Sequence, residues 1–317
     1  MAVAVGMTVE LSYCVVNTGK RQLMLRGLDA ISRERARVPF ATEVLVLDNA
    51  SEDGSAQAAT EHPGVDAVLT GERRAGKPEA FNRLLERSRG RFCLLLDEDA
   101  ELRPGATAAL HAALDSRPRA AAAGARLLNP SGAVQASAWR FPSPGSALAA
   151  ALFLHRWLTV QSRGAAVRRV DWAQSAAMLI RREAAERVGG MDPAFFVYSD
   201  EVDFCRRLAD AGWETIWVPD AIAVHHEQLS AVHGHERRVV EFSRNRDLYM
   251  RKHHSAAAAR AVRWLTAWAY ALRALIALVV PGRSPRRLWR HVRASLAPGR
   301  GQGLREASEP PRATPDR

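Results

Sequence analysis

Short hydrophobic runs alternate with helical patterns over the first third of the chain. The predicted strands are residues 9–16, 43–47, 65–69 and 91–96. Residues 20–32 and 78–88 predict helices, and the polar turn before Ser55 predicts another helix with Ser55 as its N-cap. Strands that alternate with helices predict an α/β fold with a parallel, doubly wound sheet up to about residue 115.

Two acidic clusters each follow an apolar run directly. The first is the Asp-Glu-Asp stretch 97–99, and the second is the Asp-Glu-Val-Asp stretch 200–203. Two carboxylates one residue apart, at the carboxyl end of a buried strand, lie where open α/β sheets bind ligands. Hard oxygen ligands suit Mg²⁺ or Mn²⁺, which carboxylates hold together with substrate phosphates. The clusters therefore indicate metal-assisted group transfer from a nucleotide-activated donor, with a base from the second cluster.

Beyond residue 115 the pattern is less regular. It predicts a hairpin at 127–134, strand-like character at 171–181, a helix at 202–211 and strands at 215–218 and 221–225. After Glu236 the chain becomes helical and basic, and we expect residues 252–254 (Lys-His-His) to form a solvated helix end. From Pro298 onward, Pro, Gly, Arg and Glu dominate without periodicity, which predicts a disordered tail.

Composition narrows the class of protein. The chain has 317 residues, 47% of them hydrophobic and 25% charged, as expected of a folded protein with a real core. Its three cysteines are far apart and fit buried side chains in a reducing compartment better than a disulfide framework or a zinc site. The formal charge of +11 implies attraction to anions. The basic residues are dispersed without an aromatic-basic motif, so we expect no nucleic-acid partner.

The longest apolar region, residues 256–280, is interrupted by three arginines, Arg260, Arg263 and Arg273. No uninterrupted run in it approaches the roughly 18 to 20 residues that span a bilayer. On a helix the arginines fall within an arc of roughly 140°. This pattern fits an interfacial amphipathic helix whose arginines meet anionic head groups, and it equally fits a helix packed on the protein's own core.

Eleven short segments, in this order and spacing, resemble the family 2 glycosyltransferases with a GT-A fold, in particular the bacterial rhamnosyltransferase-like branch. They are 15–17, 47–55, 76–82, 96–99, 171–172, 178–182, 188–192, 195–207, 211–213, 218–221 and 224–226. Each segment is weak alone, but their joint order over residues 8–255 is specific. The resemblance implies a GT-A-type, Rossmann-like, mostly parallel sheet flanked by helices, with a C-terminal helical extension.

The resemblance implies a binding site for a nucleotide-sugar donor. Asp48 matches the residue that accepts a hydrogen bond from the donor's pyrimidine ring, and Asn17 lies near the same nucleotide. Lys77 and Asn82 match positions that line the diphosphate, where a lysine acts as a point charge against phosphate. Asp97, in the acidic signature, also contacts the donor through the metal.

The resemblance also implies the metal ligands and the base. Asp97 and Asp99 match the DxD signature that holds Mg²⁺ or Mn²⁺, and His225 matches a histidine that completes the metal sphere. An inverting transfer needs a base for the acceptor hydroxyl, and Glu201 occupies that position. The family usually has Glu-Asp where this chain has Asp200-Glu201, so Asp200 is the alternative base.

These expectations combine into one hypothesis with alternatives. It is an inverting, metal-dependent glycosyltransferase that uses dTDP-rhamnose or a UDP-sugar, with a saccharide or lipid-linked acceptor, in cell-surface polysaccharide synthesis. The expected domains are a GT-A domain at 1–235 (nucleotide half 1–115, acceptor half 116–235), a helical extension at 236–297 and a tail at 298–317. We expect a cytoplasmic location at the inner face of the membrane, with contact to anionic lipid. A non-catalytic nucleotide-sugar-binding pseudoenzyme and a sugar nucleotidyltransferase remain the alternatives.

Overall fold

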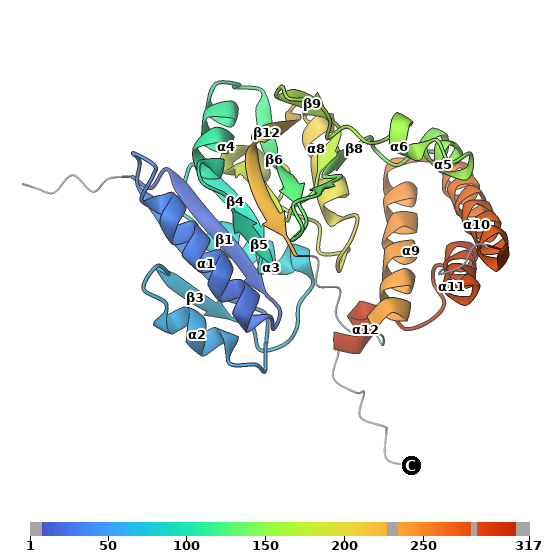
Figure 1. Cartoon of the computed structure of the whole chain (residues 1–317), viewed down its shortest axis with the longest axis horizontal. Helices are drawn as coiled ribbons and strands as arrows, with labels where there is room; N and C mark the ends of the chain where they lie inside the picture. The colour runs from blue at the N-terminus through green and yellow to red at the C-terminus, as the bar shows by residue number, and fades with distance from the viewer. Residues whose placement is uncertain (1–7, 227–233, 280–283, 309–317) are drawn as a thin grey trace, which may run out of the picture.

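The hydrophobic runs form the strands of the computed structural model, which describes residues 8–226, 234–279 and 284–308 (Figure 1). The strands are β1 (Leu11–Asn17), β2 (Thr42–Asp48), β3 (Ala67–Thr70), β4 (Phe92–Asp97), β5 (Ala100–Leu102), β6 (Ala120–Leu128), β7 (Val134–Gln135), β8 (Ala138–Trp139), β9 (Arg168–Val170), β10 (Trp172–Ala173), β11 (Ala177–Arg181) and β12 (Glu214–His225). The helices are α1 (Arg21–Arg35), α2 (Ser55–Glu61), α3 (Lys77–Arg87), α4 (Ala106–Asp115), α5 (Pro144–Ala151), α6 (His155–Leu158), α7 (Arg182–Arg187), α8 (Asp200–Asp210), α9 (Gly234–His253), α10 (Ala256–Val279), α11 (Pro285–Leu296) and α12 (Leu304–Ser308).

One large sheet runs through the middle of the molecule. Its strand order is β3-β2-β1-β4-β11-β6-β12-β5, with β7 beside β6 and β9 beside β12. Strands β1 to β4 run parallel to one another, whereas β11 lies antiparallel between β4 and β6. The predicted α/β fold with a parallel N-terminal half is therefore confirmed. The carboxyl ends of β1, β2 and β4 meet at one edge, as expected for a ligand-binding sheet.

Each face of the sheet has its own hydrophobic core, because alternate residues of a strand face opposite sides. In β1, Leu11, Tyr13 and Val15 pack in the cluster that contains residues of α1 and α4. Cys14 and Val16 pack in the opposite cluster, with residues of α3 and α8. Burial on both faces explains why these strands form nearly continuous apolar runs in the sequence.

Two local predictions differ from the structure. The predicted strands at 215–218 and 221–225 are one strand, β12, whose register against β6 shifts between Val218 and Ile222. Pro219 lies in that shift, and a proline has no N–H for a regular ladder. The N-cap of α2 is Gly54 in a left-handed conformation, φ 76°, and not Ser55, whose hydroxyl group donates to Asp53 instead.

The C-terminal helices pack against the α/β part through α9. Tyr249 and Met250 of α9 join Phe195 and Val202 in a third hydrophobic cluster. The predicted disordered tail is wrong for its first part, because α12 is helical and Glu306 pairs with Arg244 of α9 at 2.6 Å. An ion pair between residues 62 positions apart cannot be predicted from the local sequence pattern. Residues 309–317 lie outside the described residues.

Helix α10 covers almost the whole of the apolar region expected at residues 256–280. Its 24 residues include a window of mean hydropathy 1.4, so by length and composition it could cross a membrane, and 28% of that window is buried. The arginines interrupt the apolar run, as expected, but the helix as a whole still reaches the length of a membrane span. The interrupting arginines do not break the helix, because arginine is a good helix former.

The contact between α8 and α9 depends on one buried carboxylate. Asp203 of α8 is fully buried and lies 2.8 Å from Arg207 Nε, 2.8 Å from Lys252 Nζ and 2.7 Å from His253 Nε2. The expectation that residues 252–254 form a solvated helix end fits Lys252, which is exposed, but is wrong for His253, whose side chain is largely buried against Asp203. A buried charge that is fully paired is stable, but it becomes costly when its partners are lost.

Replacing Asp203 should therefore destabilise the protein. We expect Asp203→Asn to lower the free energy of unfolding by about 3 kcal/mol, because two helices lose their common anion and the partly buried side chains of Arg207 and His253 lose their ionic partner. Asp210→Asn is the matched control, since Asp210 is on the same helix but pairs with Arg206 at the surface. It should change stability by less than about 0.5 kcal/mol. Urea denaturation measures both, and equal losses would contradict the assignment.

Candidate active site

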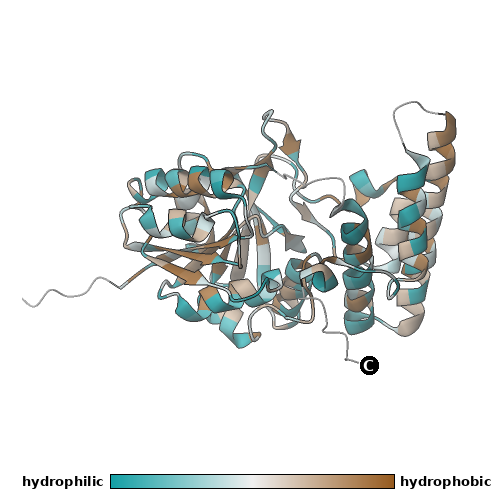
Figure 2. Cartoon of the chain, turned by 90° about the horizontal axis from the view of Figure 1, so that it is seen from below, coloured by the Kyte–Doolittle hydropathy of each residue, from teal (hydrophilic) through white to brown (hydrophobic). Residues whose placement is uncertain are grey.

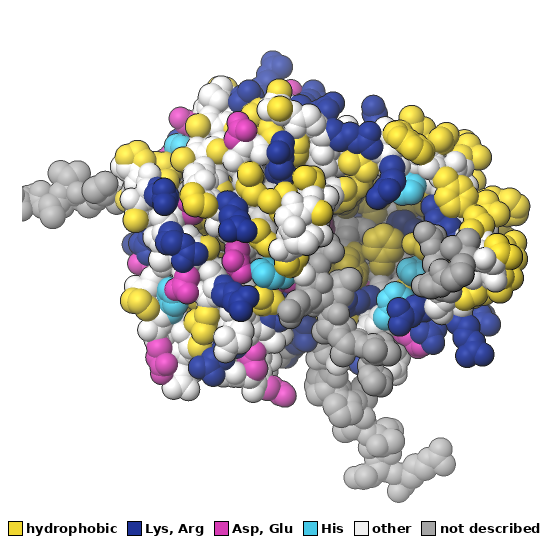
Figure 3. All heavy atoms as spheres, viewed as in Figure 1, with side chains coloured by type: hydrophobic (Ala, Val, Ile, Leu, Met, Phe, Trp, Pro, Cys, Tyr) yellow, Lys and Arg dark blue, Asp and Glu magenta, His cyan; other side chains and the backbone are white. Residues whose placement is uncertain are grey.

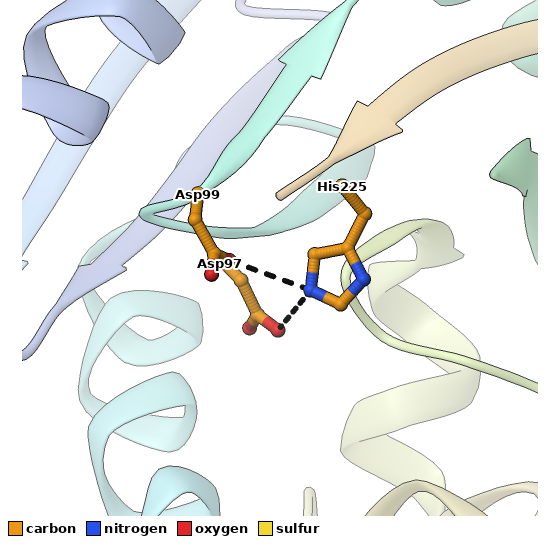
Figure 4. Close-up of side chains that lie close together, drawn as sticks. All are labelled: Asp97, Asp99 and His225. Carbon is orange, nitrogen blue, oxygen red and sulfur yellow. Dashed lines mark ion pairs between the residues drawn. The ribbon is translucent and has the colours of Figure 1, made fainter. Parts of the chain in front are cut away.

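Three potential metal ligands come together at the carboxyl edge of the sheet (Figure 4). Asp97 ends β4, Asp99 lies in the turn to β5, and His225 ends β12. In the antiparallel β12–β5 pair His225 lies opposite Ala100, which brings its ring beside Asp99. His225 Nε2 lies 3.4 Å from Asp99 Oδ1 and 4.0 Å from Asp97 Oδ2. The neighbouring His226 faces away and pairs with Glu101 at 2.7 Å.

This cluster has a suitable donor set for a divalent cation. One ligand atom from each of the three residues lies within 4.8 Å of the others. Two carboxylates and an imidazole suit Mn²⁺, and the carboxylates suit Mg²⁺. Burial acts to raise the pKa of Asp99, but its hydrogen bond with His225 and the charge of Lys20 hold that pKa well below its usual range. The carboxylate is therefore ionised and available as a ligand.

Lysine side chains neutralise the acidic cluster. Lys77 Nζ lies 2.6 Å from Asp97 Oδ1, and Lys20 Nζ lies 2.7 Å from Asp99 Oδ2 and 3.4 Å from Glu98 Oε1. The sequence analysis selected Lys77 but missed Lys20. The signal was the position of Lys20 in the turn directly after the first strand, at the same edge as the acidic stretch.

Asp48 and Asn17 form a second polar group at the same edge. They end adjacent parallel strands, β2 and β1, and lie opposite each other in register. Asn17 donates from Nδ2 to Asp48 Oδ1 at 2.7 Å, and the main-chain N–H of Ser51 donates to Asp48 Oδ2 at 3.0 Å. Both side chains are buried. Asn17 therefore fixes the orientation of Asp48.

The side chain of Asn82 makes its hydrogen bonds elsewhere, with the main chain of Met191. Its Nδ2 donates to the carbonyl of Met191 at 2.7 Å, and its Oδ1 accepts from the N–H of Met191 at 2.8 Å. Both polar atoms of the amide are thus used by main chain, so Asn82 supports the segment before α8. The place of Asn82 at the diphosphate, which the resemblance implied, stays a prediction.

The two carboxylates of the second cluster begin α8. Tyr198 and Ser199, directly before the helix, both have left-handed backbone conformations, with φ 68° and 61°. Consecutive non-glycine residues in this region are uncommon and are found where a site holds the backbone in a strained shape. This turn sets the positions of Asp200 and Glu201. No feature of the sequence predicts this turn.

Asp200 and Glu201 are adjacent carboxylates in the first turn of α8. Burial, and then the charge of Asp200, raises the pKa of Glu201 well above the usual carboxyl range, while Lys77 acts in the opposite direction. Among the described residues the two buried oxygens of Asp200 have no hydrogen-bond partner. A carboxyl group with a raised pKa is suited to general base catalysis near neutral pH.

Lys77 joins the two acidic clusters. Burial acts to lower the pKa of Lys77, but the charges of Asp97, Asp200 and Glu201 raise it, so the side chain is a cation shared between them. Its main-chain N–H donates to the carbonyl of Phe196 at 2.7 Å, and a Cβ at Gly76 would lie 3.0 Å from the same oxygen. The absence of a side chain at Gly76 thus lets the start of α3 approach the segment before α8.

The comparisons with known proteins agree with this architecture. The model of the "Glycosyltransferase like family 2" matches residues 10–271. N-acetylglucosaminyl-diphospho-decaprenol L-rhamnosyltransferase from Mycobacterium tuberculosis is 30% identical over 294 residues, which cover 85% of this chain and 94% of the relative. The mannosyltransferase PcManGT from Pyrobaculum calidifontis, solved with GDP-Man and Mn²⁺, has a TM-score of 0.58 at 19% identity and covers 92% of this chain and 86% of its own.

A second solved structure extends the likeness in fold. GalNAc-T7, solved with UDP, GalNAc and Mn²⁺, has a TM-score of 0.59 at 16% identity, over 92% of this chain and 55% of its own. At these identities the solved structures support the fold alone, whereas the family model spans most of the chain. The chain therefore belongs to glycosyltransferase family 2 and has the GT-A fold.

Proposed function

We propose that this glycosyltransferase transfers a sugar with inversion from a nucleoside diphosphate donor to an acceptor hydroxyl group, and that it depends on a divalent cation. The observation that carries the proposal is the position of Lys77 between the two acidic clusters. Lys77 forms an ion pair with Asp97, and the charges of Asp200 and Glu201 raise its pKa. A group that binds a leaving diphosphate and a group that accepts a proton thus lie on either side of one cation.

Asp97, Asp99 and His225 would hold the cation, which is Mg²⁺ or Mn²⁺. The presence of Mn²⁺ in both solved GT-A neighbours favours Mn²⁺. When bound, the ion stabilises the negative charge that develops on the leaving nucleoside diphosphate.

The donor's nucleotide would bind at Asp48, and its diphosphate at Lys77. The carboxylate of Asp48, held by the Nδ2 of Asn17, would accept a hydrogen bond from a pyrimidine N–H. The ammonium group of Lys77 sits on a flexible stem, so it can exchange Asp97 for a phosphate oxygen. Lys20 can make the same exchange from Asp99, which would leave both carboxylates free as ligands.

Glu201 would accept the proton from the acceptor. The acceptor oxygen forms a bond to the anomeric carbon of the sugar while the bond from that carbon to the diphosphate oxygen breaks. The proton passes to Glu201, and the electron pair leaves with the nucleoside diphosphate. Attack on the face opposite the leaving group inverts the anomeric centre. Asp200 raises the pKa of Glu201, which makes it a stronger base once it is ionised.

The proposed substrates follow the relatives. The Mycobacterium tuberculosis enzyme is named for rhamnosyl transfer to a diphospho-decaprenol acceptor, so we propose dTDP-rhamnose or a UDP-sugar as donor here. The acceptor would be a saccharide, carried on a lipid, in cell-surface polysaccharide synthesis. Such an acceptor places the reaction at the surface of a membrane.

Donor binding provides the direct test. We expect Mn²⁺ and one nucleotide sugar together to raise the melting temperature by about 5 °C at a donor concentration of about 100 Kd, because a ligand that binds only the folded state stabilises it by about 2.7 kcal/mol. Asp99→Asn should lose this shift, since it removes a metal ligand. The measurement is a thermal shift against a panel of UDP-, dTDP- and GDP-sugars, each with and without Mn²⁺.

Glu101→Gln is the matched control, because Glu101 follows the acidic stretch but pairs with His226 on the other side. It should keep the full shift. A folded wild-type protein that no donor stabilises would contradict the proposed site. Donor binding with no transfer to any saccharide acceptor would favour the non-catalytic alternative.

The pH dependence distinguishes the two candidate bases. We expect kcat/KM to rise with pH through the raised pKa of Glu201, because only the ionised carboxylate accepts a proton. Asp200→Asn should move this rise to lower pH, since it removes a negative charge that raises the pKa. Glu201→Gln should lower kcat by at least about a hundredfold at every pH. If Asp200→Asn abolished transfer and Glu201→Gln did not, Asp200 would be the base.

A further inference from the structure

Exposed hydrophobic side chains gather at the end of the molecule farthest from α1. Figure 3 shows them over α5, α6 and α10, and Figure 2 shows the hydrophobic residues along the outermost helices. Its exposed members include Leu152, Trp157, Leu158, Trp264, Trp268 and Val279. Helices α5 and α10 are packed together, because Arg273 of α10 donates to the carbonyl of Ala150 in α5 at 3.2 Å. We call this region the apolar end surface.

The exposed side of α10 is apolar along its length. Trp264, Trp268, Leu275 and Val279 recur at helical spacing and are all exposed, with Trp264 at 67% and Val279 at 81%. Isolated exposed apolar residues are ordinary, but a continuous apolar patch on a folded protein marks an interaction site.

Two of the three arginines of α10, Arg263 and Arg273, turn away from this exposed side. Arg263 makes two contacts of 2.6 Å with Asp247 of α9, and Arg273 lies over the ring of Phe153 while it binds Ala150. Of the three arginines that the sequence analysis placed toward head groups, Arg260 alone is exposed. The basic groups that flank the apolar end surface come from α11 instead.

Helix α11 supplies a basic border. Arg286, Arg287, Arg290 and Arg293 are exposed beside Trp289, and residues 285–296 contain no Asp or Glu. Arg290 pairs with Glu236, so three of the four arginines have no acidic partner of this kind among the described residues. Tryptophan at the level of lipid head groups, with arginine beside it, is typical of proteins that lie in a membrane interface.

We propose that the apolar end surface, bordered by α11, docks the enzyme in the plane of an anionic lipid bilayer. The tryptophans and leucines enter the boundary between head groups and acyl chains, and the α11 arginines bind lipid phosphates. The inference deepens the proposed function and rests on it for its role, since it names the surface that brings the enzyme to a lipid-linked acceptor.

The charge and packing of the helices decide against two other occupants. A second copy in a symmetric dimer would bring two basic α11 helices together, and the net charge of +11 opposes that contact. A bilayer-spanning α10 would expose the Arg263–Asp247 pair and Arg273 to hydrocarbon, which is costly. If α10 instead lies in the membrane interface, the Arg263–Asp247 pair and Arg273 stay packed against protein, and lipid covers only the exposed apolar side of α10.

The docking surface is tied directly to the helix that carries the base. Helix α9 packs between α10 and α8, where Lys252 and His253 bind Asp203. Asn245 of α9 also donates to the carbonyl of Val197, in the segment directly before Asp200. A bilayer bound at the apolar end surface would therefore hold Glu201 at a fixed distance from the lipid.

Co-sedimentation of the full chain with vesicles tests the proposal. We expect binding to phosphatidylcholine vesicles that contain phosphatidylglycerol, and weaker binding to phosphatidylcholine alone. Arg286→Glu with Arg287→Glu and Arg293→Glu should lower the partition coefficient by at least about a hundredfold. The matched control reverses Arg26, Arg33 and Arg37, which are exposed around α1 at the opposite end, and should bind like wild type.

Trp264→Ala with Trp268→Ala tests the apolar contribution. This variant should bind at least about tenfold more weakly, and should show less quenching of tryptophan fluorescence by lipids brominated in their acyl chains, with Trp157 and Trp289 remaining at the surface. Both side chains are exposed, so the fold should not change, and an unaltered thermal shift with the donor and Mn²⁺ checks this.

Separate outcomes distinguish this inference from the proposed function. Absence of wild-type binding to anionic vesicles, or equal binding by all variants, would overturn the docking surface even if donors bind. The docking surface would also be overturned if the wild type were a dimer that became a monomer with the α10 substitutions and with the α11 substitutions. Vesicle binding as expected without stabilisation by any donor would instead count against the proposed function alone.

Discussion

The acidic edge of the sheet depends on two lysine ammonium groups. Asp97, Glu98 and Asp99 lie close together, and like charges at this distance oppose one another unless cations intervene. Lys20 and Lys77 supply that compensation at 2.7 Å and 2.6 Å. Under the proposed function, a divalent cation would replace them on the carboxylates, and the released ammonium groups would bind the diphosphate. The two lysines offset most of the acidic charge of the cluster.

This compensation also explains the shape of the surrounding chain. Lys77 reaches both acidic clusters because the start of α3 presses against Phe196 through Gly76. The same segment continues into the left-handed pair Tyr198 and Ser199. Close main-chain approach on one side and a strained turn on the other therefore fix the separation between the metal-ligand cluster and Glu201. Neither device increases stability by itself, which is typical of a functional constraint.

Local patterns predicted the fold and the residues that end strands. The apolar runs of β1, β2 and β4 predicted both the parallel sheet and the positions of Asp48 and Asp97, because buried strands are continuous in sequence and end at the same edge. The expected free cysteines are also confirmed, as all three are buried and unpaired. Side-chain partners could not be predicted in the same way. Asn82 binds Met191 at a separation of 109 residues. Arg263 and Arg273 of α10 turn inward to Asp247 and Ala150. Tertiary packing decides these contacts.

The buried carboxylate of Asp203 affects how the chain can be divided. Its partner Arg207 belongs to the same helix, but Lys252 and His253 arrive about fifty residues later, on α9. A fragment that stops before residue 252 would keep the whole sheet and every candidate catalytic residue, yet it would leave that anion half-compensated beneath the helix of Glu201. The C-terminal helices therefore supply part of the positive charge that compensates Asp203 beneath the helix of Glu201. A chimera that joins these helices to the sheet of a related enzyme would need both sides of this contact exchanged together.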